Sequence, residues 1–183
     1  MPVFAHRFAY KSDFLRAPME QSFSLPDGLT KAQQYEQFLR DYALFIDGET
    51  DLIAALSNTS AALREAFGFF WVGFYLVKDA DWLSLGPFQG SVACARIRRG
   101  RGVCGTAWAE ARTQLVPDVD LFPGHIACSS LSRSEIVVPL LDPTAAVRGV
   151  LDIDSDRLAA FDEEDRRGLE QVVQLLCKQI FPE

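Results

Sequence analysis

The sequence predicts an α+β fold: a single domain with a central antiparallel sheet of about six strands, helices on one face and a loop-enclosed pocket on the other. Three observations lead to this prediction. The chain has 183 residues, which suits one domain, and 49% of them are hydrophobic, which is enough for a sizeable core. Patterns of helical period come before and after the strand-like segments. Those segments are short and separated by turn signals, which favours antiparallel pairing.

The chain is expected to divide into an N-terminal arm, residues 1–29, and a folded domain, residues 30–183. Pro18, Pro26 and Gly28 discourage regular structure in the arm. The first 18 residues lack the apolar stretch of a secretory signal, although their basic residues leave a transit peptide as an alternative.

Three long helices are predicted over about 30–47, 50–67 and 163–180, where apolar residues recur at helical spacing. Thr30 is the expected N-cap of the first helix. Each helix has an apolar face that can pack on a sheet, and we expect Cys177 of the third helix to lie in that core.

The first strand is predicted from Phe69 to Val77, because this segment is rich in β-branched and aromatic residues. Strand alternation places Trp71, Gly73 and Tyr75 on one face, with the glycine leaving a gap between the two aromatic side chains. The two rings are either core residues or one wall of a pocket.

Shorter elements follow this strand. We expect strands at Leu83–Leu85 and Val92–Ile97, a short helix over Val103–Ala109 and a strand at Thr113–Val116. The first two strands extend the antiparallel sheet.

A long loop is predicted for residues 117–134, which contain two prolines, many polar residues and little periodicity. Cys128 lies in this loop, where a thiol is either exposed to a substrate or folded down as small apolar packing. We interpret His125 as a loop residue that bonds backbone groups rather than as a ligand or a base.

Two further strands are predicted, Glu135–Leu141 and Val147–Asp154. Alternation in the second places Asp152 and Asp154 on one face and Val147, Gly149, Leu151 and Ile153 on the other. In a partly buried pocket, one of two such close carboxyl groups would keep its proton and could donate it. The alternative is that one aspartate caps a helix and the other is solvent-exposed.

The charge of the chain argues against nucleic acid and membrane partners. The formal net charge is −7, which repels phosphate backbones, and no apolar run reaches the ~18 residues of a membrane span. The local exceptions are Arg96, Arg98, Arg99 and Arg101, which we interpret as a solvated strand end and turn. The four cysteines are typical of a reducing compartment, and we expect the protein in the cytoplasm.

Three thiols and three carboxylates together predict thiol redox chemistry on a small polar molecule. The thiols are Cys94, Cys104 and Cys128, and the carboxylates are Glu135, Asp152 and Asp154. A zinc site formed by the three thiols and His125 is the weaker alternative, because the close ligand pairs of structural zinc sites are missing. We therefore expect neither a metal nor a cofactor.

Several segments resemble the free methionine-(R)-sulfoxide reductases, which are built on the GAF fold. They are WVGFYL, LGPFQG, ACARI, GRGVCGTA, DV, FPGHIAC, SEIVVPL and GVLDIDS, followed by FDEEDRRGLE. Their order and nearly all their spacings are kept from about Thr30 to the carboxyl end. The sequence departs from the family at Ser129, where an aspartate is usual, and at Arg98 and Arg99, where a proline and an apolar residue are common.

The resemblance implies reduction of free methionine-(R)-sulfoxide to methionine through a cysteine sulfenic acid and an intramolecular disulfide, with thioredoxin as reductant and no cofactor. It implies that Cys128 is the catalytic thiol, Cys94 the principal resolving thiol and Cys104 the third cysteine of the set. It also implies a substrate site formed by Trp71, Tyr75, Glu135, Asp152 and Asp154.

The competing hypothesis is a GAF module that binds a ligand or senses oxidants without turnover. Three thiols at these spacings are superfluous for simple binding, so we expect the enzyme. The sequence is compatible with a homodimer but does not fix the oligomeric state.

Overall fold

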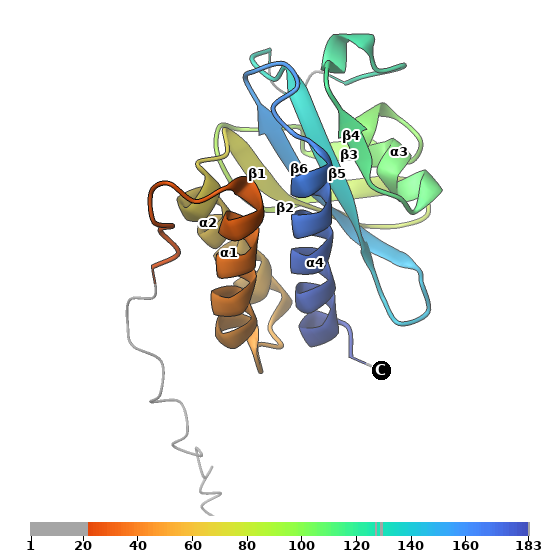
Figure 1. Cartoon of the computed structure of the whole chain (residues 1–183). Helices are drawn as coiled ribbons and strands as arrows, with labels where there is room; N and C mark the ends of the chain where they lie inside the picture. Colours follow the sequence, from red (N-terminus) through yellow and green to blue (C-terminus); the bar gives the residue numbers. More distant parts are fainter. Residues whose placement is uncertain (1–21, 127, 129, 183) are drawn as a thin grey trace, which may run out of the picture.

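The central sheet has the six antiparallel strands that the sequence predicts. In the computed structural model, which describes residues 22–126, 128 and 130–182, the strand order is β3-β2-β1-β6-β5-β4 (Figure 1). All neighbouring strands are antiparallel. The strands are β1 (Trp71–Val77), β2 (Trp82–Gln89), β3 (Arg96–Arg98), β4 (Gln114–Val116), β5 (Ser134–Leu141) and β6 (Val147–Ser155).

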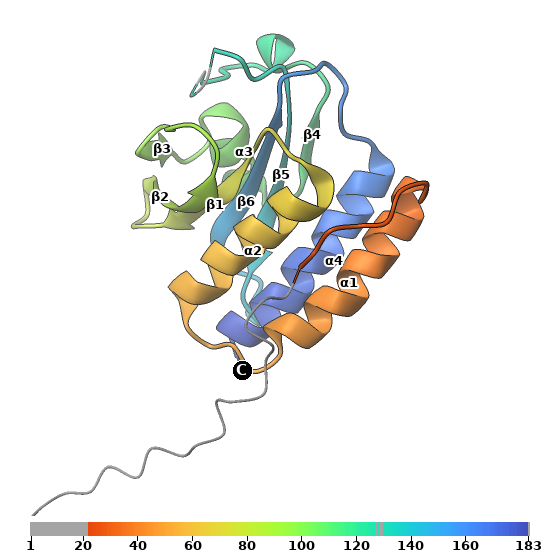
Figure 2. The same cartoon turned by 90° about the vertical axis from the view of Figure 1, so that its left-hand side faces the viewer.

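The three long helices lie on one face of the sheet, as predicted (Figure 2). They are α1 (Lys31–Ile46), α2 (Leu52–Phe67) and α4 (Glu163–Ile180). Helix α2 packs on β1 and β2, whereas α4 packs on β5 and α1 packs mainly on α4. The short helix α3 (Gly102–Glu110) contacts β5 and β6, and a 3₁₀ turn spans Val119–Leu121 in the long loop.

Side-chain caps fix where the long helices begin. Thr30 forms a capping box with Gln33, and Asp162 forms one with Asp165. The Asp51 side chain accepts a hydrogen bond from the backbone N–H of Ala54 at the start of α2. Such caps satisfy N–H groups that have no partner within the helix.

Strand alternation divides the buried side chains into two cores. On β6, Leu151 and Ile153 join the larger core beneath the long helices. Val150 joins a smaller core beneath α3 and the loops, together with Trp71 and Tyr75. Each central strand therefore presents one face to each core.

Cys177 lies in the larger core, as predicted. Burial raises the pKa of its thiol to about 12, so this group is protonated near neutral pH. The sheet separates Cys177 from the smaller core on the opposite face.

The predicted strand at Val92–Ile97 is wrong for most of its length, because only Arg96–Arg98 pairs with β2. Strand β2 is correspondingly longer than the predicted Leu83–Leu85. Gly90 has φ +140° and lies against the Trp71 ring, whose Nε1 donates a hydrogen bond to the carbonyl of Ser91 at 2.9 Å. These contacts take the chain out of the sheet, so Cys94 lies in a loop.

The last residues of the predicted arm pack on the helices. Phe23 is buried against the rings of Phe38 and Phe45, and the hydroxyl of Ser22 donates a hydrogen bond to Glu65 at 2.6 Å. The rest of the predicted arm, residues 1–21, lies outside the described residues. Among the helices that the structure describes, none is long and apolar enough to span a membrane.

We predict that Gly168→Ala destabilises the protein although alanine is the better helix former. A Cβ at Gly168 would overlap the ring of Tyr35 on α1, and that ring is held by a 3.0 Å hydrogen bond from its hydroxyl to Asp165. We expect a loss of about 1–3 kcal/mol in urea unfolding, the usual range for overpacking. The control Gln171→Ala, at an exposed position of α4, should change stability by less than about 0.5 kcal/mol. Equal stability of both variants would show that the α1–α4 contact adapts freely.

Candidate active site

The register of the central strands gathers three carboxyl groups on the face opposite the long helices. Glu135 on β5 lies directly opposite Asp154 on β6, and Asp152 lies two residues further along the same face of β6. The partners of these aspartates on β1 are Trp71 and Gly73. Residues directly opposite each other in a sheet share a face, so strand pairing alone brings the predicted acidic residues together.

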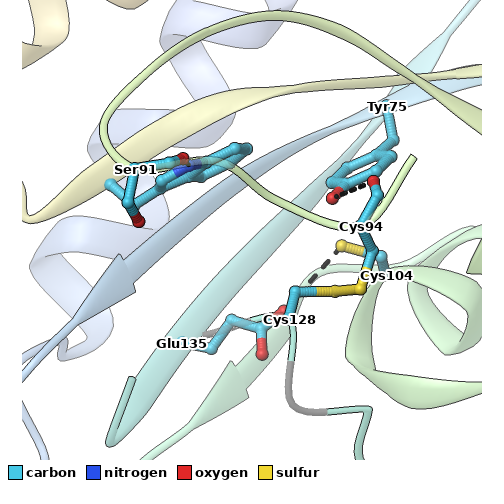
Figure 3. Close-up of a disulfide and its surroundings, with 7 residues drawn as sticks. Tyr75, Ser91, Cys94, Cys104, Cys128 and Glu135 are labelled. Carbon is cyan, nitrogen blue, oxygen red and sulfur yellow. Dashed lines mark hydrogen bonds between the residues drawn. A yellow bond between two sulfur atoms is a disulfide. The ribbon is translucent and has the colours of Figure 1, made fainter. Parts of the chain in front are cut away.

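Helix α3 adds a thiol to this acidic cluster. The Cys104 thiol is buried and donates a hydrogen bond to Glu135 Oε1 at 3.8 Å (Figure 3). One ligand atom each of Cys104, Glu135 and Asp152 lies within 4.8 Å of the other two. Asp152 Oδ1 is buried and has no hydrogen-bond partner in the described part of the chain. The cluster could therefore hold a small cation.

Burial controls the protonation of the cluster. Removal from water raises the pKa of Glu135 and of Asp152 well above the ordinary carboxyl range, and repulsion from Asp154 adds to both shifts. Burial raises the pKa of Asp154 to about 6. Burial also raises the pKa of Cys104, which stays a thiol near neutral pH. At pH 7, Glu135 and Asp152 therefore keep their protons, whereas Asp154 is largely ionised.

A disulfide joins Cys94 to Cys128 beside this cluster (Figure 3). The two Cα atoms are 5.2 Å apart although 34 positions separate the residues in the chain. The bond links the loop after β2 to the long loop before β5, and both cysteines are half-buried. The Tyr75 hydroxyl donates a hydrogen bond to the carbonyl of Cys94 at 3.0 Å, which anchors the first of these loops.

The predicted aromatic pair is buried in the smaller core. Trp71 and Tyr75 lie with ring centroids 6.3 Å apart, and Phe88 stacks on the other side of Trp71 at 5.4 Å. The gap predicted above Gly73 is filled, because a Cβ there would lie 2.7 Å from the Trp71 ring and would overlap Phe88. Phe88 was not predicted as part of this cluster, because the expected strand ended at Leu85 whereas β2 continues to Gln89.

The cavity between the disulfide and the acidic cluster has a volume of about 30 Å³, which is room for about one water molecule. Its lining includes Cys104, Cys128, Glu135, Asp152 and Asp154, together with Ile97, Arg101, Gly102, Val103, His125, Ile126 and Ser132. Trp71 and Tyr75 are not part of this lining in the disulfide-bonded state.

Two polar residues of the lining were not predicted as site residues. His125 Nδ1 and Ser132 Oγ are buried without a hydrogen-bond partner in the part of the chain that the structure describes. The backbone N–H of His125 donates a hydrogen bond to the carbonyl of Phe122 at 3.0 Å, so this residue bonds a backbone group in the loop, as predicted. Ser132 belongs to a run of polar loop residues with no pattern that distinguishes it. Ser129, the predicted departure beside Cys128, lies outside the described residues.

The structure decides between two earlier interpretations of the aspartates on β6. Asp152 is buried and Asp154 is half-buried, and both line the cavity. Neither caps a helix, since α4 is capped by Asp162. Both aspartates therefore face the cavity, and their roles in substrate binding and proton transfer stay predictions.

Comparisons with known proteins agree with this geometry. The GAF domain model matches residues 51–180. GAF domain-containing protein A of Dictyostelium discoideum is 56% identical over 80% of this chain and 92% of its own length. The free methionine-R-sulfoxide reductase of Escherichia coli is 49% identical over 82% of this chain and 90% of its own length.

A solved structure gives the same result. The X-ray structure of free methionine-R-sulfoxide reductase from Neisseria meningitidis in complex with its substrate has a TM-score of 0.81 and 52% identity, covering 85% of this chain and 93% of that one. The chain therefore belongs to the GAF-domain family and, within it, to the free methionine-R-sulfoxide reductases.

Proposed function

We propose that this protein reduces free L-methionine-(R)-sulfoxide to L-methionine, with Cys128 as the nucleophile. The observation that carries the proposal is the Cys94–Cys128 disulfide beside a buried cluster of carboxyl groups. A disulfide between two loops is the product expected after a thiol has taken oxygen from a sulfoxide. The adjacent acids supply the proton that this reaction needs.

The first step transfers oxygen from sulfur to sulfur. The Cys128 thiolate attacks the electrophilic sulfoxide sulfur while a carboxyl group protonates the sulfoxide oxygen. Oxygen passes to Cys128, which becomes a sulfenic acid, and methionine leaves with its sulfur reduced by two electrons. The Cys94 thiol then attacks the sulfenic acid, forming the disulfide and releasing water.

The carboxyl groups have two tasks in this scheme. Glu135 and Asp152, whose pKa values are raised most strongly, retain a proton near pH 7 that one of them can give to the sulfoxide oxygen. Asp154, with a pKa of about 6, is largely ionised at pH 7 and attracts the substrate ammonium group. A peptide-bonded methionine has no such ammonium group, so this contact selects the free amino acid.

The described state corresponds to the oxidised enzyme after methionine has left. Its cavity of about 30 Å³ is far too small for an amino acid. Opening the disulfide frees both loops, and the substrate then enters above the acidic cluster. We propose that Trp71 and Tyr75, which share the β1 face with Gly73, then receive the S-methyl end.

Turnover requires an external dithiol, because each cycle consumes two thiols of the enzyme. We propose thioredoxin as that reductant, and the cytoplasm as the compartment in which it is kept reduced.

Cys104 is positioned beside Glu135 as a reserve thiol, and its reactivity is lower because its pKa is raised. The homodimer stays a prediction.

The substrate prediction is tested with the separate R and S sulfoxides of methionine and with an N-acetylated R sulfoxide. We expect methionine formation from the free R form alone, with thioredoxin, its reductase and NADPH. Release of methionine is followed by chromatography. No turnover of any substrate by a folded protein with titratable thiols would favour the sensor hypothesis.

The roles of the two bridged cysteines are tested by substitution. We expect Cys128→Ser to produce no methionine. Cys94→Ser should form about one methionine per enzyme before stalling, because the sulfenic acid forms but is not efficiently resolved. Cys177→Ser is the control, since this cysteine lies in the other core and should leave turnover intact. Normal activity of Cys128→Ser would overturn the assignment of the nucleophile.

The pH dependence of substrate binding tests Asp154. Its pKa of about 6 means that the carboxylate is ionised above this pH and protonated below it. We therefore expect the KM to rise as the pH falls through about 6 in the wild type. This rise in KM should be absent from Asp154→Asn and present in the control Asp156→Asn, which changes an exposed residue. If the rise in KM remains in Asp154→Asn, it is caused by the titration of another residue.

A further inference from the structure

We propose that a positively charged surface beside the disulfide recruits an acidic dithiol protein as the reductant. This surface, here called the arginine surface, consists of Arg96, Arg98, Arg99 and Arg101. The inference rests on the proposed function, since a reductant is needed only if the disulfide turns over. It adds which face of the molecule the reductant approaches and what charge that reductant carries.

The charge of the chain is strongly segregated. Between Trp82 and Pro117 there are five arginines and one acidic residue, whereas the whole chain has a formal net charge of −7. This segment forms β2, β3, α3 and β4 and includes Cys94. The positive charge is thus concentrated in the segment that carries Cys94, on an otherwise acidic protein, and it attracts acidic partners to that segment.

The arginine surface lies at an edge of the fold. Strand β3 is the last strand of the sheet, and Figure 2 shows it beside α3. Arg96 and Arg98 are exposed, and because the Ile97 side chain between them lies in the smaller core, they point to the opposite face of this edge strand. The guanidinium of Arg99 lies 5.3 Å from the centre of the Trp108 ring, so a cation–π contact holds it in place.

The arginines are available to a partner. All four are exposed, and none forms an ion pair within the described residues. The acidic residues nearest along the paired strands are Asp79 and Asp81 of the β1–β2 turn, and the Asp79 side chain accepts backbone N–H bonds there. The negative charges of these two carboxylates therefore leave the four arginines with a net positive charge.

Both disulfide-bearing loops are joined to this surface. Cys94 lies two residues before Arg96, and Arg101 lines the cavity together with Cys128. The N–H of Gly102, next to Arg101, donates a hydrogen bond to the carbonyl of Gly124 in the long loop at 3.2 Å. A partner drawn to this edge of the fold is therefore close to both loops that carry the disulfide.

Exposed apolar side chains at the same place favour a protein partner. Val92 is 88% exposed and lies two residues before Cys94, and Ile126 is 38% exposed and lies two residues before Cys128. Apolar residues around a reactive bond with charges at their border are typical of a protein interface. A small thiol needs neither feature.

The reductant transfers two electrons by thiol–disulfide exchange. One thiolate of the partner attacks a sulfur of the bridge, which breaks the bond and gives a mixed disulfide. The second thiolate of the partner then displaces the enzyme thiol, so the enzyme gains two thiols and the partner becomes a disulfide. Recruitment by charge raises the rate of the first encounter and leaves these bonds unchanged.

The test is the charge-reversed variant Arg96→Glu with Arg98→Glu, assayed with a reduced acidic thioredoxin and, separately, with dithiothreitol. At low ionic strength we expect kcat/KM for thioredoxin to fall by about tenfold or more. The loss should vanish at about 1 M salt, where the Debye length is about 3 Å. The rate with dithiothreitol should match that of the wild type.

The matched control reverses the same charge elsewhere, with Arg148→Glu and Arg167→Glu, both exposed. It should keep the wild-type efficiency with thioredoxin. Equal losses in the two variants, an equal loss with dithiothreitol, or a loss that salt does not remove would overturn the inference. Tighter binding of a single-stranded oligonucleotide than of thioredoxin at the same salt would also overturn it. If the wild type fails with dithiothreitol, the proposed function is wrong instead.

Discussion

Strand β6 must satisfy two opposite environments at once, and the site depends on this constraint. Leu151 and Ile153 point into the apolar core beneath the long helices, while Asp152 and Asp154 point into the cavity. A shift of one residue in register would bury both carboxylates in the apolar core and expose the leucine and isoleucine to the site. Packing of the far face therefore fixes the positions of the acids, and the cost of their burial is offset by that core.

The same burial gives the carboxyl groups their chemical differences. Glu135 and Asp152 lie deepest and have the most strongly raised pKa values, whereas Asp154 is half-buried and has a pKa of about 6. Because of this difference in burial, Glu135 and Asp152 keep their protons near neutral pH, whereas Asp154 loses its proton. In the proposed reaction, this difference suits Glu135 and Asp152 to proton donation and Asp154 to recognition of a cation.

Much of the fold could be predicted from the sequence, because alternation and helical period are local properties. The faces of β1 and the opposite faces of Leu151 and Ile153 and of Asp152 and Asp154 on β6 were predicted correctly on this basis. The face of Val147 was not, because an irregularity in the β5–β6 register places it against the smaller core. The path of residues 92–95 was predicted wrongly, because the chain leaves the sheet where Gly90 contacts the ring of Trp71, which is distant in the sequence. The buried Nδ1 of His125 and Oγ of Ser132 were also missed, because polar loop residues carry no periodic signal. The adjacency of Cys94 and Cys128 came only from the family resemblance, as no local pattern predicts contact across 34 positions.

The position of Cys177 has a consequence for the accuracy of the redox cycle. In the proposed cycle, a sulfenic acid at Cys128 would condense with whichever thiol reaches it first, and a wrong pairing would trap the protein in a dead-end state. The six-stranded sheet stands between Cys177 and the site, and burial also keeps this thiol protonated. The sheet thus works as a partition that limits the competing thiols to Cys94 and Cys104. Fidelity of disulfide pairing is in this way a property of the architecture, which both keeps Cys177 away from the site and lowers the reactivity of its thiol.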